Sequence, residues 1–163
     1  MKKKYSILLV LVLALLSAFF GIPGEEEAYI PAAQEIVASQ VLDDGSTLIT
    51  ADGIYTSKED VALYIHTYGC LPQNFMTKDE ARNLGWEGGS LEEFAPGMCI
   101  GGDRFGNYEG LLPKQSGRKY TECDIDTMGA DVRGAKRIVF SNDGLIYYTD
   151  DHYESFELLY GES

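Results

Sequence analysis

One stretch in the middle of the chain has the apolar spacing of an amphipathic helix. In "SKEDVALYIHTYG" the apolar side chains recur at i, i+3, i+4 and i+7, and the set is Val61, Tyr64, Ile65 and Tyr68. Ser57 can cap the first turn, and Gly69 suits the position just after the last turn. The pattern therefore predicts a helix between these two residues.

Capping signals predict two further helices downstream. Thr77 and Glu80 in "TKDEARNLGW" have the spacing of a capping box, in which each side chain satisfies a backbone N–H of the first turn. Ser90 and Glu93 in "SLEEFAPG" have the same spacing, and Pro96-Gly97 would end this short third helix.

The pattern then changes to short runs of β-branched and aromatic residues separated by turn residues. The runs are "CIGGDRF", "RKYTECDI", "KRIVFS", "LIYYTD" and "FELLY", and the intervening "SNDG" is typical of a hairpin turn. Helices followed by strands favour an α+β fold. We expect three N-terminal helices packed on one face of a twisted antiparallel β-sheet of about five strands.

The N-terminus has the pattern of an export signal. Three lysines at positions 2 to 4 precede a long uncharged apolar run, as in the n-region and h-region of a signal peptide. The run is also near the length of a spanning helix, so a retained anchor is the alternative. We expect a signal over residues 1–24, a pro-segment or linker over 25–54 with a short helix near 31–41, and a secreted domain over 55–163.

The charge of the chain is strongly acidic but unevenly distributed. The 163 residues carry a net charge of −13, which alone argues against a nucleic-acid partner, because such proteins usually present a basic face. Residues 104–137 are the exception, with seven basic and five acidic side chains and a local charge of +2. This excess is either ordinary surface variation or the basic part of a binding face.

The few cysteines and histidines limit the disulfide and metal chemistry. Export permits disulfides, but an odd count leaves at least one of Cys70, Cys99 and Cys123 free or paired between molecules. Their spacings match no zinc site, so we expect no metal or other cofactor. Strand alternation places Cys123 in the core, facing away from Glu122, and we expect no bridge between Cys99 and Cys123.

The strand "YTECDI" brings a carboxylate to the open face of the expected sheet. Alternation places Glu122 on that face, while Cys123 and Ile125 face the core. Arg133 and Arg137 flank the turn into the next strand. A carboxylate, a histidine and two arginines on one face suit phosphoryl chemistry, as a base, an acid and clamps for anionic oxygens. The alternative is that these residues form surface ion pairs.

The stretch "TDDHYESF" holds one of the two histidines among carboxylates. Negative neighbours stabilise the imidazolium, so Asp150, Asp151 and Glu154 should favour protonated His152. His152 is then either a working acid or a solvated residue on an acidic surface.

Several longer motifs follow one another in the order of a known family. They are "TKDEARNLGW", "APG", "IGGDRFGNYEGLLP", "SGRKYTECDI", "RGAKRI", "LIYYT" and "DHY", within the span from Val61 to Phe156. In these motifs the chain resembles the barnase-like family of guanyl-preferring secreted bacterial ribonucleases. The resemblance implies the microbial ribonuclease fold and metal-independent cleavage of single-stranded RNA. The implied reaction is transesterification to a 2′,3′-cyclic phosphate, which water then opens.

The resemblance also implies a role for each matching residue. Glu122 matches the general base and His152 the general acid, while Arg133, Arg137 and Lys78 match the groups that stabilise charge on the phosphate. The implied substrate-binding residues are Asp103, Tyr153 and the guanine-binding loop of Phe105, Gly106, Asn107, Tyr108 and Glu109. A carboxylate in that loop would accept the parallel N1–H and N2–H donors of guanine, whereas adenine presents an acceptor at N1.

The chain departs from the family where RNA binding is concerned. Tyr108 stands where the family usually has a basic residue, the segment from Glu122 to Arg133 is one residue longer, and the chain is acidic. A weakly active RNA-binding or toxin-like module on the same fold is therefore one alternative. A secreted hydrolase that acts on sugars through two carboxylates is another. The expected partners of a monomeric enzyme are RNA and a barstar-like intracellular inhibitor, with no stable membrane partner after signal removal.

Overall fold

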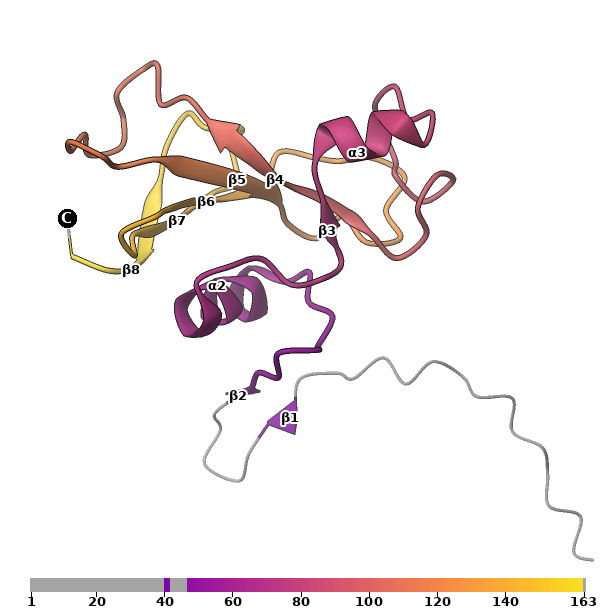
Figure 1. Ribbon diagram of the computed structural model, residues 1–163, viewed down its shortest axis with the longest axis horizontal. Coiled ribbons are helices and arrows are strands. Elements are labelled where there is room, and N and C mark those ends of the chain that lie inside the picture. Colours follow the sequence, from indigo (N-terminus) through magenta and orange to yellow (C-terminus); the bar gives the residue numbers. More distant parts are fainter. Residues whose placement is uncertain (1–39, 42–46, 163) are drawn as a thin grey trace, which may run out of the picture. The chain divides into compact units, whose positions relative to one another are not determined.

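The computed structural model describes residues 40–41 and 47–162, and these form an α+β domain (Figure 1). The helices are α2 (Lys58–Tyr68) and α3 (Lys78–Asn83), and the strands are β1 (Gln40–Val41), β2 (Thr47–Leu48), β3 (Phe75–Met76), β4 (Cys99–Phe105), β5 (Tyr120–Asp124), β6 (Arg137–Ser141), β7 (Ile146–Thr149) and β8 (Glu157–Tyr160). Strands β3 to β8 form one sheet in that order, antiparallel except for the parallel pair β3–β4. The α+β class and the five expected strands are confirmed, and β3 adds a strand that no apolar run predicts.

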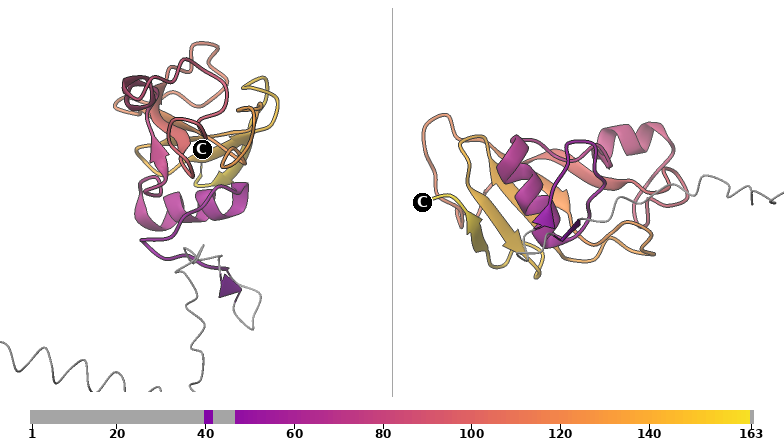
Figure 2. Two further views of the ribbon diagram at one scale, coloured as in Figure 1. Left: turned by 90° about the vertical axis from the view of Figure 1, so that its right-hand side faces the viewer. Right: turned by 90° about the horizontal axis from the view of Figure 1, so that it is seen from below.

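Helix α2 forms where the apolar spacing predicts it and packs against one face of the sheet (Figure 2). The Ser57 hydroxyl caps it by accepting a hydrogen bond from the Asp60 N–H at 3.2 Å. Gly69 follows the helix in the left-handed conformation, and its N–H donates to the Ile65 carbonyl at 2.8 Å. Tyr68, at the end of the predicted apolar face, is exposed. The buried residues of the helix are Val61, Ala62, Tyr64 and Ile65.

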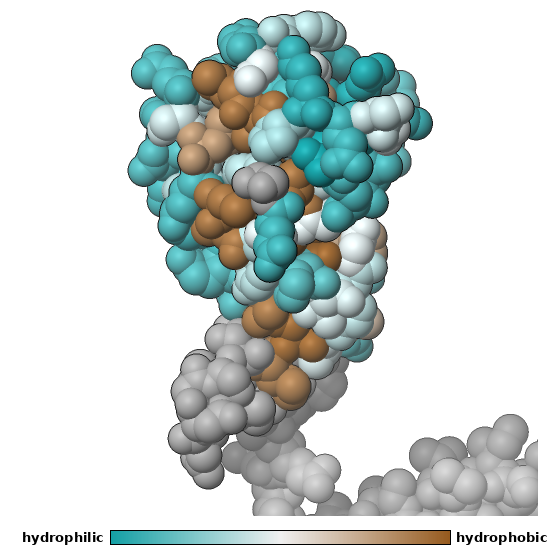
Figure 3. Space-filling model, turned by 90° about the vertical axis from the view of Figure 1, so that its left-hand side faces the viewer, coloured by the Kyte–Doolittle hydropathy of each residue, from teal (hydrophilic) through white to brown (hydrophobic). Residues whose placement is uncertain are grey.

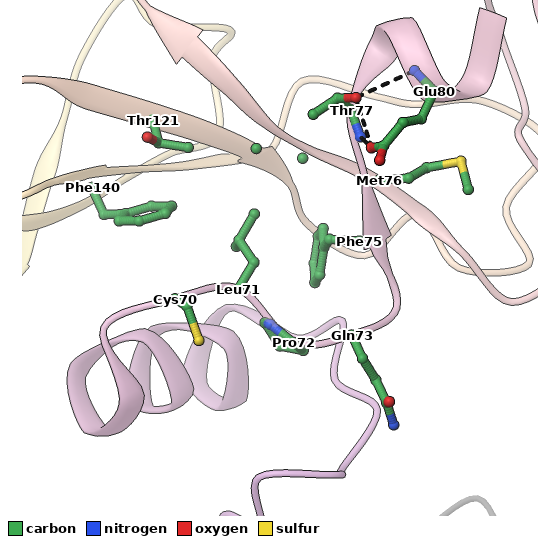
Figure 4. Close-up of a pocket in the computed structure, with 12 residues that line it drawn as sticks. Cys70, Leu71, Pro72, Gln73, Phe75, Met76, Thr77, Glu80, Thr121 and Phe140 are labelled. Carbon is green, nitrogen blue, oxygen red and sulfur yellow. Dashed lines mark hydrogen bonds between the residues drawn. The ribbon is translucent and has the colours of Figure 1, made fainter. Parts of the chain in front are cut away.

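Helix α3 begins at the predicted capping box. The Thr77 hydroxyl accepts from the Glu80 N–H at 3.3 Å, and the Thr77 N–H donates to Glu80 Oε2 at 2.8 Å (Figure 4). Ala81 is the buried residue of the helix and packs in a cluster with Trp86 and Ile100. This cluster joins α3 to β4, which places the first residue of the helix near the sheet.

The prediction of a third helix in "SLEEFAPG" is wrong. The segment forms a single turn in which two successive N–H groups donate to the Leu91 carbonyl, at 3.0 and 2.9 Å. The Ser90 hydroxyl donates to the Ala130 carbonyl at 2.8 Å, and the Glu92 carboxylate accepts from the Gly129 N–H at 3.2 Å. One of these tertiary hydrogen bonds engages Ser90, the expected capping residue, and together they fasten the segment to the loop between β5 and β6.

Strand alternation divides the sheet into a face covered by α2 and an opposite face that carries Glu122. Cys123 and Ile138 belong to the core beneath α2 and are 1% and 0% exposed. The opposite face has its own apolar cluster, whose buried members are Leu112, Tyr120, Val139, Leu145 and Tyr147. The predicted orientation of Cys123 in the core, away from Glu122, is confirmed.

Residues 49–55, which the sequence assigns largely to the linker, hydrogen-bond to α2 and to the core. The Tyr64 hydroxyl donates to the Ala51 carbonyl at 2.8 Å. Tyr55 is 3% exposed, and Asn74 bridges its backbone, donating to the Tyr55 carbonyl at 2.9 Å. These residues therefore belong structurally to the domain.

Of the helix expected near residues 31–41, only Gln40 and Val41 are described, and they form β1, paired antiparallel with β2. The expected signal segment lies outside the described residues. Among the residues that are described, no helix is long and apolar enough to cross a membrane. One face of the molecule shows apolar side chains in several separate groups among hydrophilic ones (Figure 3).

All three cysteines are free in the structure. Cys70 is exposed just after α2, whereas Cys99 and Cys123 are buried in neighbouring strands. Burial raises the pKa of both buried thiols, well above the usual value for Cys123. The buried pair therefore remains protonated and behaves as small apolar side chains.

Candidate active site

A pocket of about 580 Å³ gathers most of the residues that the sequence singles out. Its walls come from three places in the chain: the end of β4 with the loop that follows, the middle of β5, and the segment after β7. The lining residues include Phe105 to Glu109, Glu122, His152 and Tyr153. The fold thus brings the expected base, the expected acid and the expected guanine loop to one cavity.

Glu122 is the central carboxylate of the site and is held by two polar partners. It lies in β5 and is 9% exposed. Its Oε2 accepts a hydrogen bond from the Tyr153 hydroxyl at 2.6 Å, and its Oε1 forms an ion pair with the Lys78 ammonium. A buried carboxylate needs such partners, because desolvation otherwise destabilises its charge. Burial and the hydrogen bond to Glu122 raise the pKa of Tyr153, so the phenol remains a donor.

Lys78 is positioned by the start of α3 and by β4. Its backbone N–H donates to Asp103 Oδ2 at 3.0 Å, and its ammonium lies 3.8 Å from the same oxygen. Asp103 lies in β4, directly opposite Glu122 in the strand register. The cap of α3 and the β4–β5 register therefore place one cation between two carboxylates at the site.

Arg133 and Arg137 converge on the buried carboxylate of Asp124. Arg133 donates to its two oxygens from Nε at 2.6 Å and from Nη2 at 2.8 Å, a bidentate arrangement. Arg137 Nε lies 2.9 Å from Asp124 Oδ1, at an angle that makes an ion pair without a hydrogen bond. The hydrogen bond to Asp124 raises the pKa of Arg133. Asp124 therefore orients both guanidinium groups.

Sequence reasoning assigned Asp124 no role, although a signal for it existed. Asp124 follows Glu122 by two residues in β5, so it shares the same face, and it lies opposite Arg137 in the register. The loop that carries Arg133 is braced from outside, since its guanidinium carbon lies 5.6 Å from the centre of the Trp86 ring. Both arginines thus lie beside the Glu122 face of the sheet and do not line the pocket itself.

His152 lies in a turn that Asp151 holds together. His152 and Tyr153 have left-handed φ angles of 57° and 74°, which are uncommon for residues other than glycine. Asp151 Oδ1 accepts from the Thr149 hydroxyl at 2.7 Å and from the Ser155 N–H at 3.0 Å, and its Oδ2 accepts from the Ser155 hydroxyl at 2.6 Å. These bonds, led by that from the Ser155 hydroxyl, lower the pKa of Asp151 to about 2. Asp151 thus supports the loop that presents the exposed His152.

The expected guanine loop is fixed from within by Asn107. This residue is 6% exposed and has a φ of 46°. Its Nδ2 donates to the Leu112 carbonyl at 2.8 Å, and its Oδ1 accepts from the Leu112 N–H at 3.0 Å. At the start of the loop, the Phe105 ring lies 5.2 Å from the Tyr153 ring, which ties the loop to the partner of Glu122.

The last two residues of the expected loop project outward. Tyr108 is 91% exposed, and Glu109 is exposed beside it. The Tyr108 ring lies over Gly106, where an added Cβ would sit 2.2 Å from Tyr108 Cε2. A glycine is therefore required at this position for the ring to lie against the backbone.

A second pocket, of about 450 Å³, lies at the α2 side of the sheet (Figure 4). Its walls are mainly apolar and include Leu71, Phe75 and Phe140, while its carboxylate, Glu80, is engaged by Thr77. Within residues 40–41 and 47–162, no group of three or more histidine, cysteine or carboxylate side chains is arranged to hold a metal ion.

Comparisons with known proteins point to one family. A family model described as ribonuclease matches residues 58–160. A ribonuclease of Bacillus intermedius is 40% identical over 163 residues, covering 96% of this chain and 98% of the relative, and one of Bacillus pumilus is 41% identical over the same shares. Guanyl-specific ribonuclease St of Saccharopolyspora erythraea is 46% identical over 57 residues, which cover 35% of this chain and 56% of that protein.

Proposed function

The chain belongs to the ribonuclease family, in its barnase-like microbial group, and we propose that it is a secreted endoribonuclease that cleaves single-stranded RNA after guanosine. Membership of the family makes the protein a ribonuclease with RNA as its substrate. The proposal of cleavage after guanosine rests on one observation: Glu122 and His152 line one pocket with the exposed Glu109.

In the proposed first step, Glu122 acts as the general base. Its carboxylate takes the proton of the ribose 2′-OH, and the 2′-oxygen attacks the adjacent phosphorus. The bond from phosphorus to the 5′-oxygen breaks, and the His152 imidazolium protonates that leaving oxygen. The products are a 2′,3′-cyclic phosphate and a free 5′-hydroxyl. Water then opens the cyclic phosphate with the roles of Glu122 and His152 exchanged.

The surrounding cations stabilise the charge that grows on the phosphate oxygens. Lys78 forms an ion pair with Glu122, the proposed general base, so its ammonium also lies close to the reacting phosphate. Arg133 and Arg137 are held beside the same sheet face by Asp124 and add positive charge without needing to reorganise. Tyr153 donates to Glu122 and helps to orient the carboxylate before the substrate arrives.

Guanosine preference rests on the exposed carboxylate of the loop. Glu109 offers two acceptor oxygens side by side, which match the N1–H and N2–H donors of guanine. Asn107 fixes the backbone that presents Glu109, and the exposed Tyr108 ring is a surface on which a base can stack. The partial similarity to guanyl-specific relatives supports this assignment.

Product analysis on two dinucleotides tests the proposal. Purified protein should cleave GpU much faster than ApU, and guanosine 2′,3′-cyclic phosphate should accumulate before the 3′-phosphate. Equal rates on the two substrates would remove the guanosine preference, and a 3′-phosphate formed without the cyclic intermediate would remove the transesterification step. Binding of GpU without turnover would instead support the weakly active module.

Secretion rests on the three N-terminal lysines and the apolar run that follows them. Expression of the full chain in a bacterium, followed by N-terminal sequencing of protein from the medium, tests it. Protein found only in the cell membrane would show that the apolar run is a retained anchor.

A further inference from the structure

A smaller pocket, of about 280 Å³, adjoins the candidate active site, and the proposed reaction does not use it. The two pockets share residues 104–107, at the start of the guanine loop. The remaining wall of the smaller pocket runs from Pro113 to Tyr120 and includes Lys114, Arg118 and Lys119. An RNA strand that leaves the guanine loop on this side therefore meets a lining rich in basic residues.

The ion pairs of the described residues single out this pocket. Of the ten lysines and arginines at positions 47–162, seven form an ion pair with a carboxylate: Lys58, Lys78, Arg82, Arg118, Arg133, Lys136 and Arg137. The three others are Arg104, Lys114 and Lys119, and all three line the small pocket. All three are also exposed. In a chain with a net charge of −13, those cations of residues 47–162 that have no carboxylate partner are thus collected at one place, beside the guanine loop.

One wall of the small pocket is held in place by hydrogen bonds of Arg118 to several partners. Its Nε donates to Asp143 at 2.9 and 3.0 Å, and its Nη2 donates to Gln115 Oε1 at 2.9 Å. The Tyr120 hydroxyl donates to the Pro113 carbonyl at 2.8 Å. The surrounding segment is thereby held in one conformation, and it carries Lys114 and Lys119 on its surface.

Lys114 also reaches toward the guanine loop. A Cβ added to Gly110, the residue after Glu109, would lie 3.4 Å from the Lys114 ammonium nitrogen. A cation so placed is available to a phosphate on the 5′ side of a nucleotide whose base Glu109 holds, while Lys114 does not line the pocket of Glu122 and His152. Exposed cations without protein partners bind phosphates mainly by releasing counterions, which costs no existing ion pair.

We propose that this pocket binds the RNA backbone phosphates on the 5′ side of the bound guanosine, chiefly through Lys114 and Lys119. The inference rests on the proposed function, since it takes the guanine loop as the base-binding site. The scissile phosphate lies 3′ to the guanosine and must reach Glu122 and His152 in the larger pocket. The 5′ phosphates leave the shared loop toward the smaller one. The acidic surface elsewhere on the protein repels the RNA strand, so these cations set the path of the RNA.

The test compares short substrates that differ only in where they extend beyond the cleaved bond. The substrates are GpU, the 5′-extended UpUpGpU and the 3′-extended GpUpU. We would measure kcat/KM on each for three proteins: the wild-type chain, the double variant Lys114→Ala/Lys119→Ala and the double variant Lys58→Ala/Lys136→Ala. The last variant removes the same charge from two lysines that are paired elsewhere. We expect the Lys114/Lys119 variant to lose the gain in kcat/KM that 5′ extension gives, while GpU and GpUpU are cleaved at wild-type rates.

Salt dependence gives a second readout on the same proteins. For UpUpGpU, the slope of log kcat/KM against log salt should become shallower by about 0.7 for each phosphate that the variant no longer neutralises, and the control variant should keep the wild-type slope. A loss confined to GpUpU, an equal loss on all three substrates, or no loss at all would overturn the inference. A wild-type chain that does not cleave GpU would instead overturn the proposed function.

Discussion

Glu122 and Glu109 line the same pocket, but the fold holds them in opposite ways. Glu122 is 9% exposed, and each of its oxygens has a partner, Tyr153 on one side and Lys78 on the other. Glu109 is exposed on a loop, beside a Tyr108 ring that is 91% exposed. The loop backbone is fixed by Asn107, while the side chains that would meet a base are left in solvent.

This difference predicts that changes at Glu122 affect the rate, whereas changes at Glu109 affect the choice of substrate. A carboxylate that is oriented before substrate binds acts in the transition state of every substrate, so changes around Glu122 should slow all of them. A carboxylate that gains its partners only from the base should change which substrate is preferred. Substitutions in the two regions therefore test whether the division holds.

The largest effect should follow removal of the buried carboxylate. Glu122→Ala should lower kcat/KM by about 10²- to 10⁴-fold on RNA and on a guanosine 3′-(p-nitrophenyl phosphate) alike, because the 2′-OH must be deprotonated in both. Glu122→Gln, which keeps the size of the side chain, should lose activity equally if proton transfer is the cause. Near wild-type activity in the Gln variant would mean that Glu122 is not the base.

His152→Ala should match that loss on RNA but not on the activated ester. RNA cleavage should fall by about 10²- to 10⁴-fold, since the 5′-alkoxide needs a proton to leave. The p-nitrophenolate departs without one, so its release, followed by absorbance, should fall far less. Equal losses on both substrates would show that His152 is not the general acid, and intact RNA cleavage would make it a solvated surface residue.

Glu109→Gln should change selection more than rate. The amide presents one acceptor to two donors of guanine, a mismatch of about 1–3 kcal/mol, or about 5- to 150-fold in the ratio of GpU to ApU cleavage. Glu87→Gln, at another exposed position, is the matched control for the loss of charge. An equal loss on GpU and ApU would place Glu109 outside base recognition.

Asn107→Ala should weaken the loop from within. It removes both hydrogen bonds to Leu112 and puts alanine at a φ of 46°, which should lower the free energy of unfolding by about 1–3 kcal/mol in urea titration. The GpU preference should fall as well, because Glu109 loses its fixed backbone. Asn83→Ala, at an exposed position at the end of α3, should change neither. Unchanged stability in Asn107→Ala would show that the loop does not depend on this side chain.

The smallest effect should come from Asp151→Ala, and it should depend on pH. The pKa of Asp151 is lowered from 3.8 to about 2, so its ionised form stabilises the fold above about pH 4, and this contribution is lost as the pH falls through about 2. The difference in melting temperature between wild type and variant should therefore shrink over that interval. A difference that stays constant down to pH 2 would mean that the carboxylate charge does not support the turn.

Local periodicity was enough to predict much of this fold. Helix α2, the cap of α3 and the opposite orientations of Glu122 and Cys123 all follow from spacing within about one or two turns or strand steps. The helix expected in "SLEEFAPG" failed because Ser90 and Glu92 hydrogen-bond to a loop some forty positions away, which no local pattern encodes. Strand β3 is only two residues long, too short to show a period.

In the candidate site, too, some features follow from the sequence and others depend on the folded structure. The face of Glu122 follows from alternation, and the family resemblance supplied the residues to look for around it. The roles of Asp124 and Asp151 depend on side chains that only the folded chain brings together, namely two arginines for the first and Thr149 with Ser155 for the second. Alternation places Asp124 on the face of Glu122, but in a chain this rich in acidic residues it does not show which arginines Asp124 meets.

The packing of residues 49–55 limits how much of the N-terminal segment can be removed without loss of stability. A cut just after Tyr55 would remove a side chain that is 3% exposed and would take the Ala51 carbonyl away from the Tyr64 hydroxyl. Because both contacts belong to the α2 core, a shortened chain should keep its full stability only if it begins at or before Ile49.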